Sequence, residues 1–197
     1  DEIATGFGRT GRLFACERAG ITPDIMCLSK GLTGGYMPMS ITVVKEKIYE
    51  AFYADWSEGK AFMHSHTYAG NPLGCAAALA VLDILDEENI LEQAENTAAW
   101  LTERLSETFG AHPNVGEIRH IGLIHALELV EDRAEKRPFD SKRRLGYAIY
   151  RRALQHGLLL RPLGDILYFN PPLNIGRNDL ETAMERMKLS MDEVLGA

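Results

Sequence analysis

A lysine at the end of an apolar run is the residue in this sequence best suited to covalent chemistry. Lys30 follows the apolar residues 25–28 and precedes Gly31. A lysine at the end of a buried strand loses hydration of its charged form, which favours a neutral, nucleophilic amine. Such an amine can form a Schiff base with an aldehyde cofactor. The alternative is an ordinary solvated lysine, which is what most lysines in proteins are.

A carboxylate 29 residues before Lys30 could complement this chemistry. An enzyme that uses pyridoxal phosphate needs a carboxylate that keeps the pyridine nitrogen protonated, so that the ring can withdraw electrons. Asp1 precedes a glycine-rich turn and could supply that group. Taken alone, Asp1 would be interpreted as a solvated or capping residue. The presence of Lys30 later in the sequence favours a catalytic role for Asp1.

Three other patterns are weaker candidates for function. Residues 6–11 match G-x-G-x-x-G, but neither a buried strand before them nor a long helix after them is expected, so we interpret them as a structural loop. His64 and His66 lack a third ligand at a suitable spacing, so no metal site is predicted. The basic stretch 133–152 contains acidic residues as well, and favours a solvated face over a nucleic-acid surface.

Composition narrows the class of protein. The 197 residues are 46% hydrophobic and 25% charged, with a formal charge of −7. An acidic chain is poorly suited to sequence-independent nucleic-acid binding. No apolar run approaches the length of a membrane span. Three cysteines in no metal-binding or disulfide pattern, Cys16, Cys27 and Cys75, indicate reduced thiols and a cytoplasmic protein.

Periodicity predicts alternating strands and helices, and therefore an α/β protein with a second, α+β part. Asn71 and Pro72 form a favourable helix start, and Asn178 with Glu181 resembles a capping box. Helices are expected over residues 45–53, 72–85, 90–109, 141–156 and 178–194, and strands over residues 25–28, 40–44, 118–121, 123–130, 158–160 and 166–169.

Three of these segments have a predicted apolar or alternating face. Helical spacing places one stripe on residues 90–109, namely Leu91, Ala94, Ala98, Leu101, Leu105 and Phe109, and another on residues 178–194, namely Leu180, Met184, Met187, Met191 and Val194. In the strand 123–130, Leu123, His125, Leu127 and Leu129 are expected on the face opposite to Ile124, Ala126 and Glu128.

Three motifs in order resemble the class III aminotransferases of fold type I. They are residues 1–11 (DEIATGFGRTG), residues 23–32 (PDIMCLSKGL) and residues 66–73 (HTYAGNPL). The resemblance implies pyridoxal phosphate as the cofactor. It implies that Lys30 is the catalytic lysine that bonds to the cofactor and that Asp1 contacts the pyridine nitrogen.

The resemblance assigns four further residues. Ile3 matches the branched residue packed against the ring face. Thr67 matches a threonine that reaches the cofactor phosphate of the partner subunit, which implies a homodimer. Arg161 matches an arginine that binds the substrate carboxylate, and Tyr168 a tyrosine that lines the substrate pocket. The implied partners are otherwise small-molecule substrates, with no nucleic acid and no membrane.

The resemblance also implies the domain organisation. Residues 1–88 correspond to the C-terminal part of a large, mainly parallel-sheet domain that binds the cofactor. Residues 89–197 correspond to a linking helix and a small α+β domain. The family's phosphate loop and its ring-stacking aromatic residue have no counterpart in this sequence. We therefore expect the sequence to be part of a longer protein, and expect this part alone to be inactive.

Overall fold

The computed structural model describes residues 1–196, which divide into two compact units. Unit 1 comprises Asp1–Leu91, and unit 2 begins at Glu92. The division falls within one long helix, α4 (Ile90–Phe109), three residues after the boundary expected from the sequence. Each unit has its own buried cluster, and each is described by itself.

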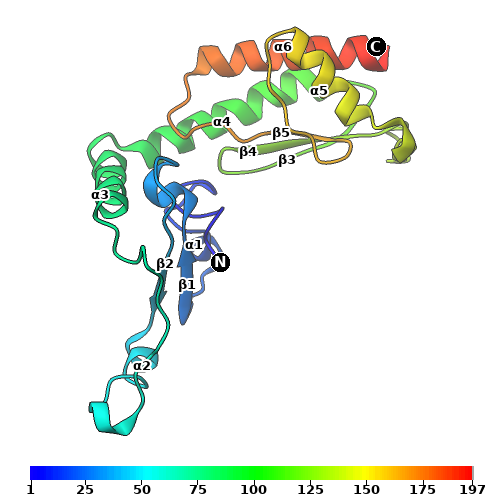
Figure 1. Cartoon of the computed structure of the whole chain (residues 1–197). Helices are drawn as coiled ribbons and strands as arrows, with labels where there is room; N and C mark the ends of the chain where they lie inside the picture. Colours follow the sequence, from blue (N-terminus) through cyan, green and yellow to red (C-terminus); the bar gives the residue numbers. More distant parts are fainter. Residues whose placement is uncertain (197) are drawn as a thin grey trace. The chain divides into compact units, whose positions relative to one another are not determined.

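Unit 1 contains a two-stranded sheet beside a long helix (Figure 1). Strands β1 and β2 pair antiparallel, with Ile25 opposite Val44 and Leu28 opposite Ile41. A small core of Phe7, Leu28, Leu32 and Ala78 joins the strand end to the helix. The elements are α1 (Ala15–Ala19), β1 (Ile25–Leu28), η1 (Lys30–Thr33), β2 (Ile41–Val44), α2 (Glu46–Tyr49), η2 (Trp56–Glu58) and α3 (Pro72–Glu87).

For the strands of unit 1, one expectation stays a prediction and another is wrong. Both sheets in residues 1–196 are antiparallel, and the mainly parallel sheet expected of the complete large domain remains a prediction. Parallel strands need a long crossover, usually helical, whereas η1 is the only element between β1 and β2. The strand before Lys30 is also not fully buried: Leu28 is, but Ile25 is 54% exposed.

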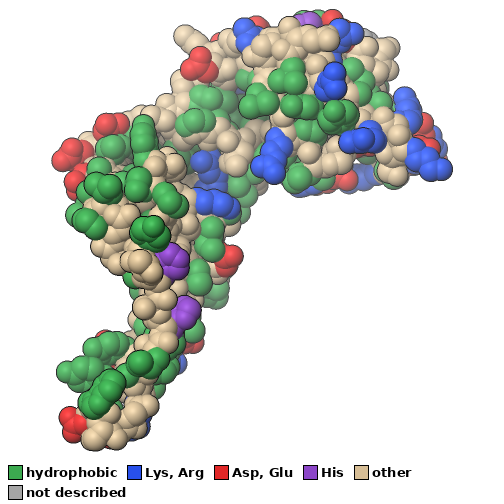
Figure 2. Space-filling view, viewed as in Figure 1, with side chains coloured by type: hydrophobic (Ala, Val, Ile, Leu, Met, Phe, Trp, Pro, Cys, Tyr) green, Lys and Arg blue, Asp and Glu red, His purple; other side chains and the backbone are tan. Residues whose placement is uncertain are grey.

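The start of α3 follows the prediction. Pro72 occupies the first turn, and the Asn71 side chain accepts a hydrogen bond from the Leu73 amide at 3.1 Å. The predicted helix 45–53 is wrong in extent, because only the single turn α2 forms. Hydrophobic side chains gather on the surface over α3 and around α2 (Figure 2), among them Leu73, Leu79, Tyr53 and Trp56.

Unit 2 packs helices on one side of a three-stranded antiparallel sheet of order β3-β4-β5 (Figure 1). Residues on β4 alternate between buried and half-buried, as predicted, so that His125, Leu127 and Leu129 face the core. Besides α4, the elements are β3 (Val115–Ile121), β4 (Ile124–Leu129), η3 (Ser141–Arg143), α5 (Leu145–Gln155), β5 (Ile166–Phe169) and α6 (Arg177–Leu195).

The long helices of unit 2 follow the sequence pattern closely. The predicted stripe of α4 is buried at Ala94, Ala98, Leu101, Leu105 and Phe109. The stripe of α6 is likewise buried at Leu180, Met184, Met187 and Met191. These faces meet over the sheet and form the largest apolar core of the described chain.

Details at helix ends and in short strands differ from the predictions. The predicted capping box of α6 is wrong, because Gly176 is the N-cap and Asn178 lies inside the first turn. Residues 158–160 do not form a strand; Leu159 is 77% exposed, while Leu160 is buried. Three consecutive leucines fit an extended segment whether or not it pairs with another strand, so the sequence alone does not determine whether residues 158–160 form a strand.

A buried histidine links α4 to the sheet. The Nε2 of His125 lies 2.8 Å from Thr102 Oγ1, and that hydroxyl donates its own proton to the Ala98 carbonyl. Nε2 must therefore be the donor in this pair. His125 is fully buried, and burial lowers the pKa of His125 to about 4. The protein therefore folds around a neutral imidazole.

This burial predicts a pH dependence of the stability of unit 2. The unfolded chain takes up a proton at His125 near pH 6.5, whereas the folded chain does so only near pH 4. The free energy of unfolding should therefore fall between pH 6.5 and 4, by at most about 3 kcal/mol. Urea unfolding followed by Trp100 fluorescence, in a Trp56→Phe background, would measure it.

His125→Gln should flatten this pH dependence. His120→Gln is the matched control, because His120 stacks on His125 at 5.0 Å but is exposed. An unchanged slope in His125→Gln would contradict the assignment to His125.

Candidate active site

Lys30 begins the 3-10 turn η1 directly after β1 and Ser29. Its backbone has φ 43°, in the left-handed region that residues with a side chain rarely adopt. Backbone conformations of this kind collect at functional sites, where surrounding contacts hold them. The Lys30 side chain is exposed. Residues 1–196 therefore do not supply the desolvation that the sequence argument assumed.

Two hydroxyl groups fix the turn on either side of Lys30. Ser29 Oγ donates to the Met39 carbonyl at 2.7 Å, and Thr33 Oγ1 donates to the Met37 carbonyl at 2.6 Å. Thr33 is only 1% exposed, so its bond is shielded from water. Because both bonds reach the segment before β2, the turn cannot shift without moving that strand.

Below the turn, Phe7 packs directly against the Gly31 backbone. A Cβ atom at Gly31 would lie 2.9 Å from Phe7 Cβ and 3.1 Å from its ring, so only glycine fits there. Phe7 is buried and meets Phe14 edge-on at 5.7 Å. The glycine-rich loop 6–11 thus serves to aim Phe7 at the lysine turn, which agrees with its interpretation as a structural loop.

Buried Glu2 holds the segment that begins with Asp1. Its carboxylate accepts hydrogen bonds from the Cys16 amide at 2.7 Å and from the Thr5 hydroxyl. Burial acts to raise the pKa of Glu2, but these hydrogen bonds outweigh it and keep the pKa below its usual value. The Glu2 amide also donates to the Cys27 carbonyl at 2.9 Å, which brings the start of the chain beside β1.

The remaining predicted cofactor residues of unit 1 lie in turns. Asp1 is exposed, and its Oδ1 accepts a hydrogen bond from the amide of half-buried Ile3 at 2.8 Å. Thr67 is exposed in a turn closed by the Ala69 amide and the His66 carbonyl, at 2.9 Å. The amine of Lys30 can bond to an aldehyde, the carboxylate of Asp1 can accept a hydrogen bond from a protonated pyridine nitrogen, and the hydroxyl of Thr67 can donate one to a phosphate. The residues of unit 1 therefore fit pyridoxal phosphate in their chemistry.

Unit 2 contains a cavity of about 580 Å³, a size typical of small-molecule sites. Arg161 lines it beside Pro162 and is exposed. Tyr168 is not among its lining residues. It is half-buried on β5, opposite Ala126 of β4. The structure therefore places Arg161, but not Tyr168, at the cavity.

Sequence reasoning missed Arg144, which also lines this cavity. Arg144 was grouped with the solvated basic stretch, because a charge run carries no information about which member faces inward. The only signal was its position directly before the apolar pattern of α5, where an N-cap residue is expected.

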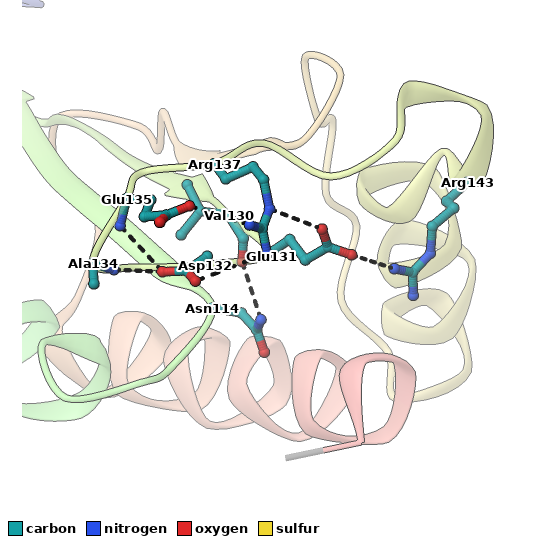
Figure 3. A network of polar contacts seen from close by, with 8 residues as sticks. All are labelled: Asn114, Val130, Glu131, Asp132, Ala134, Glu135, Arg137 and Arg143. Carbon is teal, nitrogen blue, oxygen red and sulfur yellow. Dashed lines mark hydrogen bonds and ion pairs between the residues drawn. The ribbon is translucent and has the colours of Figure 1, made fainter.

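A network of ion pairs orders the loop that leads to Arg144 (Figure 3). Glu131 lies between two arginines, with Arg137 Nε at 3.3 Å and Arg143 Nη1 at 3.7 Å. Asp132 accepts hydrogen bonds from the amides of Ala134 and Glu135. These contacts tie the end of β4 to η3, the turn directly before Arg144.

Comparison with known proteins identifies the family. The profile described as "Aminotransferase class-III" matches residues 1–191. The chain belongs to the class III aminotransferases. These enzymes depend on pyridoxal phosphate, a cofactor for which the side chains of Lys30, Asp1 and Thr67 carry suitable groups.

Individual relatives match this aminotransferase chain from end to end. The adenosylmethionine-8-amino-7-oxononanoate aminotransferase of Geobacter sulfurreducens is 45% identical over 196 residues, covering 100% of this chain and 43% of the relative. The solved enzyme of the same name from Methanocaldococcus jannaschii is 36% identical, with a TM-score of 0.90, covering 98% of this chain and 45% of that one.

A solved (S)-enantioselective omega-transaminase from Thermomicrobium roseum is also similar. It is 37% identical, with a TM-score of 0.90, covering 99% of this chain and 43% of that one. The class III chain thus spans less than half the length of the relatives it matches. No helix in residues 1–196 has the length and apolar character needed to cross a membrane, and no cluster of potential metal ligands occurs there.

The contact between Phe7 and Gly31 yields a prediction for this aminotransferase chain. Gly31→Ala should lower the local stability of the Lys30 turn by about 1–3 kcal/mol, because the added Cβ clashes with Phe7. Amide hydrogen exchange at Leu32, whose N–H donates to the Ser29 carbonyl, would measure the free energy of opening.

A double-mutant cycle isolates the contact. In a Phe7→Gly background the clashing atoms are gone, so Gly31→Ala should cost much less. An equal cost in both backgrounds would show that Phe7 does not determine the glycine requirement.

Proposed function

We propose that the complete protein is a pyridoxal-phosphate-dependent aminotransferase that converts 8-amino-7-oxononanoate to 7,8-diaminononanoate, with S-adenosylmethionine as amino donor. The observation that carries this proposal is the similarity, at 40–45% identity along nearly all of this chain, to several relatives named adenosylmethionine-8-amino-7-oxononanoate aminotransferase. Such a reaction belongs to biotin biosynthesis. The ordered Lys30 turn supports the catalytic part of the proposal.

Lys30 is the proposed catalytic residue. When bound, pyridoxal phosphate would supply an electron-withdrawing ring that stabilises negative charge on the substrate carbon. The Nζ of Lys30 would bond to the cofactor at rest. As a free amine, the same Nζ would accept a proton from the substrate carbon as general base and would then donate that proton to the cofactor as general acid.

The other residues of unit 1 would hold the cofactor. Asp1 would keep the pyridine nitrogen protonated, through a carboxylate whose Oδ1 accepts a hydrogen bond from the Ile3 amide. Ile3 would pack on the ring face. Thr67 would bind the phosphate in the partner subunit, so the proposed assembly is a homodimer.

Arg161 and Tyr168 would bind the substrate in the proposed enzyme. A planar guanidinium can hold a carboxylate through two hydrogen bonds and keeps its charge at any physiological pH. The cavity beside Arg161 has apolar walls for a methylene chain. Tyr168 on β5 does not line this cavity, and its proposed contact with the substrate rests on the family resemblance alone. Residues 1–88 and 89–197 would belong to the large and small domains, and the enzyme would work in the cytoplasm.

A second candidate is a class III transaminase that acts on another ω-amino acid. The similarity to the omega-transaminase of Thermomicrobium roseum supports it. A third is a chain that folds and dimerises without catalysis, which would follow if no second half of the enzyme exists. Substrate competition separates the first two. A search for the upstream coding sequence addresses the third.

Removing the Lys30 amine tests the catalytic assignment. In the complete enzyme, Lys30→Ala should lower kcat about 10²–10⁴-fold, the usual contribution of a general acid–base group. Added methylamine should partly restore the rate by replacing the lost amine. Lys45→Ala is the control, because Lys45 is an exposed lysine paired with Asp24 at 3.1 Å. A Lys30→Ala enzyme with the kcat of the native enzyme would contradict the assignment.

The role of Arg161 predicts a difference between the two half-reactions. Arg161→Ala should raise KM for 8-amino-7-oxononanoate by about tenfold to a hundredfold, because a hydrogen-bonded charge contributes about 1.5–3 kcal/mol. The donor half-reaction should change differently, since S-adenosylmethionine carries its carboxylate next to the reacting amine. Stopped-flow kinetics of each half-reaction would show this.

Arg161→Lys should restore the affinity only in part, since a point charge lacks the planar fork. Equal losses in both half-reactions would instead indicate a structural role for Arg161.

A further inference from the structure

The cavity of unit 2 carries an excess of positive charge. Its charged lining residues are Arg144, Arg161 and Asp165. The Asp165 Oδ1 accepts a hydrogen bond from the Gly146 amide at 2.9 Å in the first turn of α5, and its single negative charge is outnumbered by the two arginines. Neither arginine is paired with a carboxylate among the described residues. The cavity is therefore prepared for an anion.

Arg144 has an unusual backbone for an arginine. It has φ 47° and ψ 49° and is the N-cap of α5, a position where glycine would fit with less strain. Its guanidinium lies over the ring of Tyr147, 4.6 Å from the centroid, and Tyr147 lines the same cavity. The aromatic ring supports the charge while leaving the edges of the guanidinium free to donate hydrogen bonds.

The network in Figure 3 fixes the residue before Arg144. Arg143 pairs with Glu131 at the end of β4 and lies over the ring of Phe139, 5.2 Å from the centroid. The Asp140 side chain accepts a hydrogen bond from the Lys142 amide at 2.9 Å. The backbone that carries Arg144 is thus held on both sides, by η3 before it and α5 after it.

We propose that Arg144 and Arg161 form a two-arginine clamp for the carboxylate of an acyclic substrate. The remaining walls suit the apolar part of such a molecule, with Tyr147, Tyr150 and Leu160 beside the two charges. This inference deepens the proposed function and rests on it for the identity of the substrate. Arg144 is thereby assigned as a specificity-determining residue that selects substrates with a carboxylate remote from the reacting carbon.

The test measures binding without turnover. Heptanoate and heptanamide share an apolar chain and differ in charge, and neither carries a group that transaminates. Isothermal titration calorimetry on the complete enzyme should show tighter binding of heptanoate. Arg144→Gly removes the guanidinium and relieves the left-handed backbone, so the fold should be preserved. It should weaken heptanoate binding by about tenfold to a hundredfold and leave heptanamide binding unchanged.

Two further variants complete the design. Lys142→Gln removes one nearby positive charge that does not line the cavity, and should leave the preference for heptanoate intact. Arg161→Ala should also weaken heptanoate binding, and the double variant should lose less than the sum of the two single losses.

The clamp is overturned if native enzyme does not prefer heptanoate, or if Arg144→Gly retains the native preference. A native enzyme that prefers heptanoate to heptanamide but does not transaminate 8-amino-7-oxononanoate would count against the proposed function alone.

Discussion

The contact between the Phe7 side chain and the Gly31 backbone is the constraint on which the site in unit 1 depends. It leaves no room for a Cβ atom at position 31, and it forces the glycine-rich loop and the lysine turn into one arrangement. Ser29 and Thr33 then tie that turn to the segment before β2. Lys30 consequently sits on a rigid backbone although its own side chain is exposed. This combination suits a residue that must both bond to a cofactor and move a proton.

Substrate recognition is assigned to other residues, in unit 2. The cavity there combines two guanidinium groups, neither paired with a carboxylate within residues 1–196, with apolar and aromatic walls. The cavity lies at the N-terminus of α5, where Asp165 accepts a hydrogen bond from the Gly146 amide and Arg144 has a left-handed backbone. In the account proposed here, the lysine turn determines the type of reaction. The arginines determine which carboxylates enter it.

Sequence patterns predicted the large elements well, because burial of a continuous stripe determines them. The faces of α4 and α6 and the alternation along β4 were all read correctly. Local hydrogen bonding was predicted less well. Asn178 and Glu181 have the right spacing for a capping box, yet the N-cap lies two residues earlier, at Gly176. Residues 158–160 were wrongly predicted to form a strand, because pairing depends on distant residues.

The candidate site shows the same division. Lys30 was selected because it follows an apolar run and its flanking residues form a specific motif, and its catalytic role stays a prediction. Its exposure could not be inferred, since burial of β1 depends on what covers it. Arg144 was missed because nothing in a run of basic residues distinguishes the one that faces a cavity. The family was thus more predictable than the environment of its residues, since sequence motifs identify the family and long-range packing determines the environment.

The central claim is that Lys30 is the residue that bonds to pyridoxal phosphate. Borohydride reduction of the complete enzyme with its cofactor, followed by proteolysis and mass spectrometry, locates the labelled lysine directly. The account predicts the label on Lys30, in the peptide that contains Ser29 and Gly31. A label on any other lysine, with Lys30 unmodified, would contradict it.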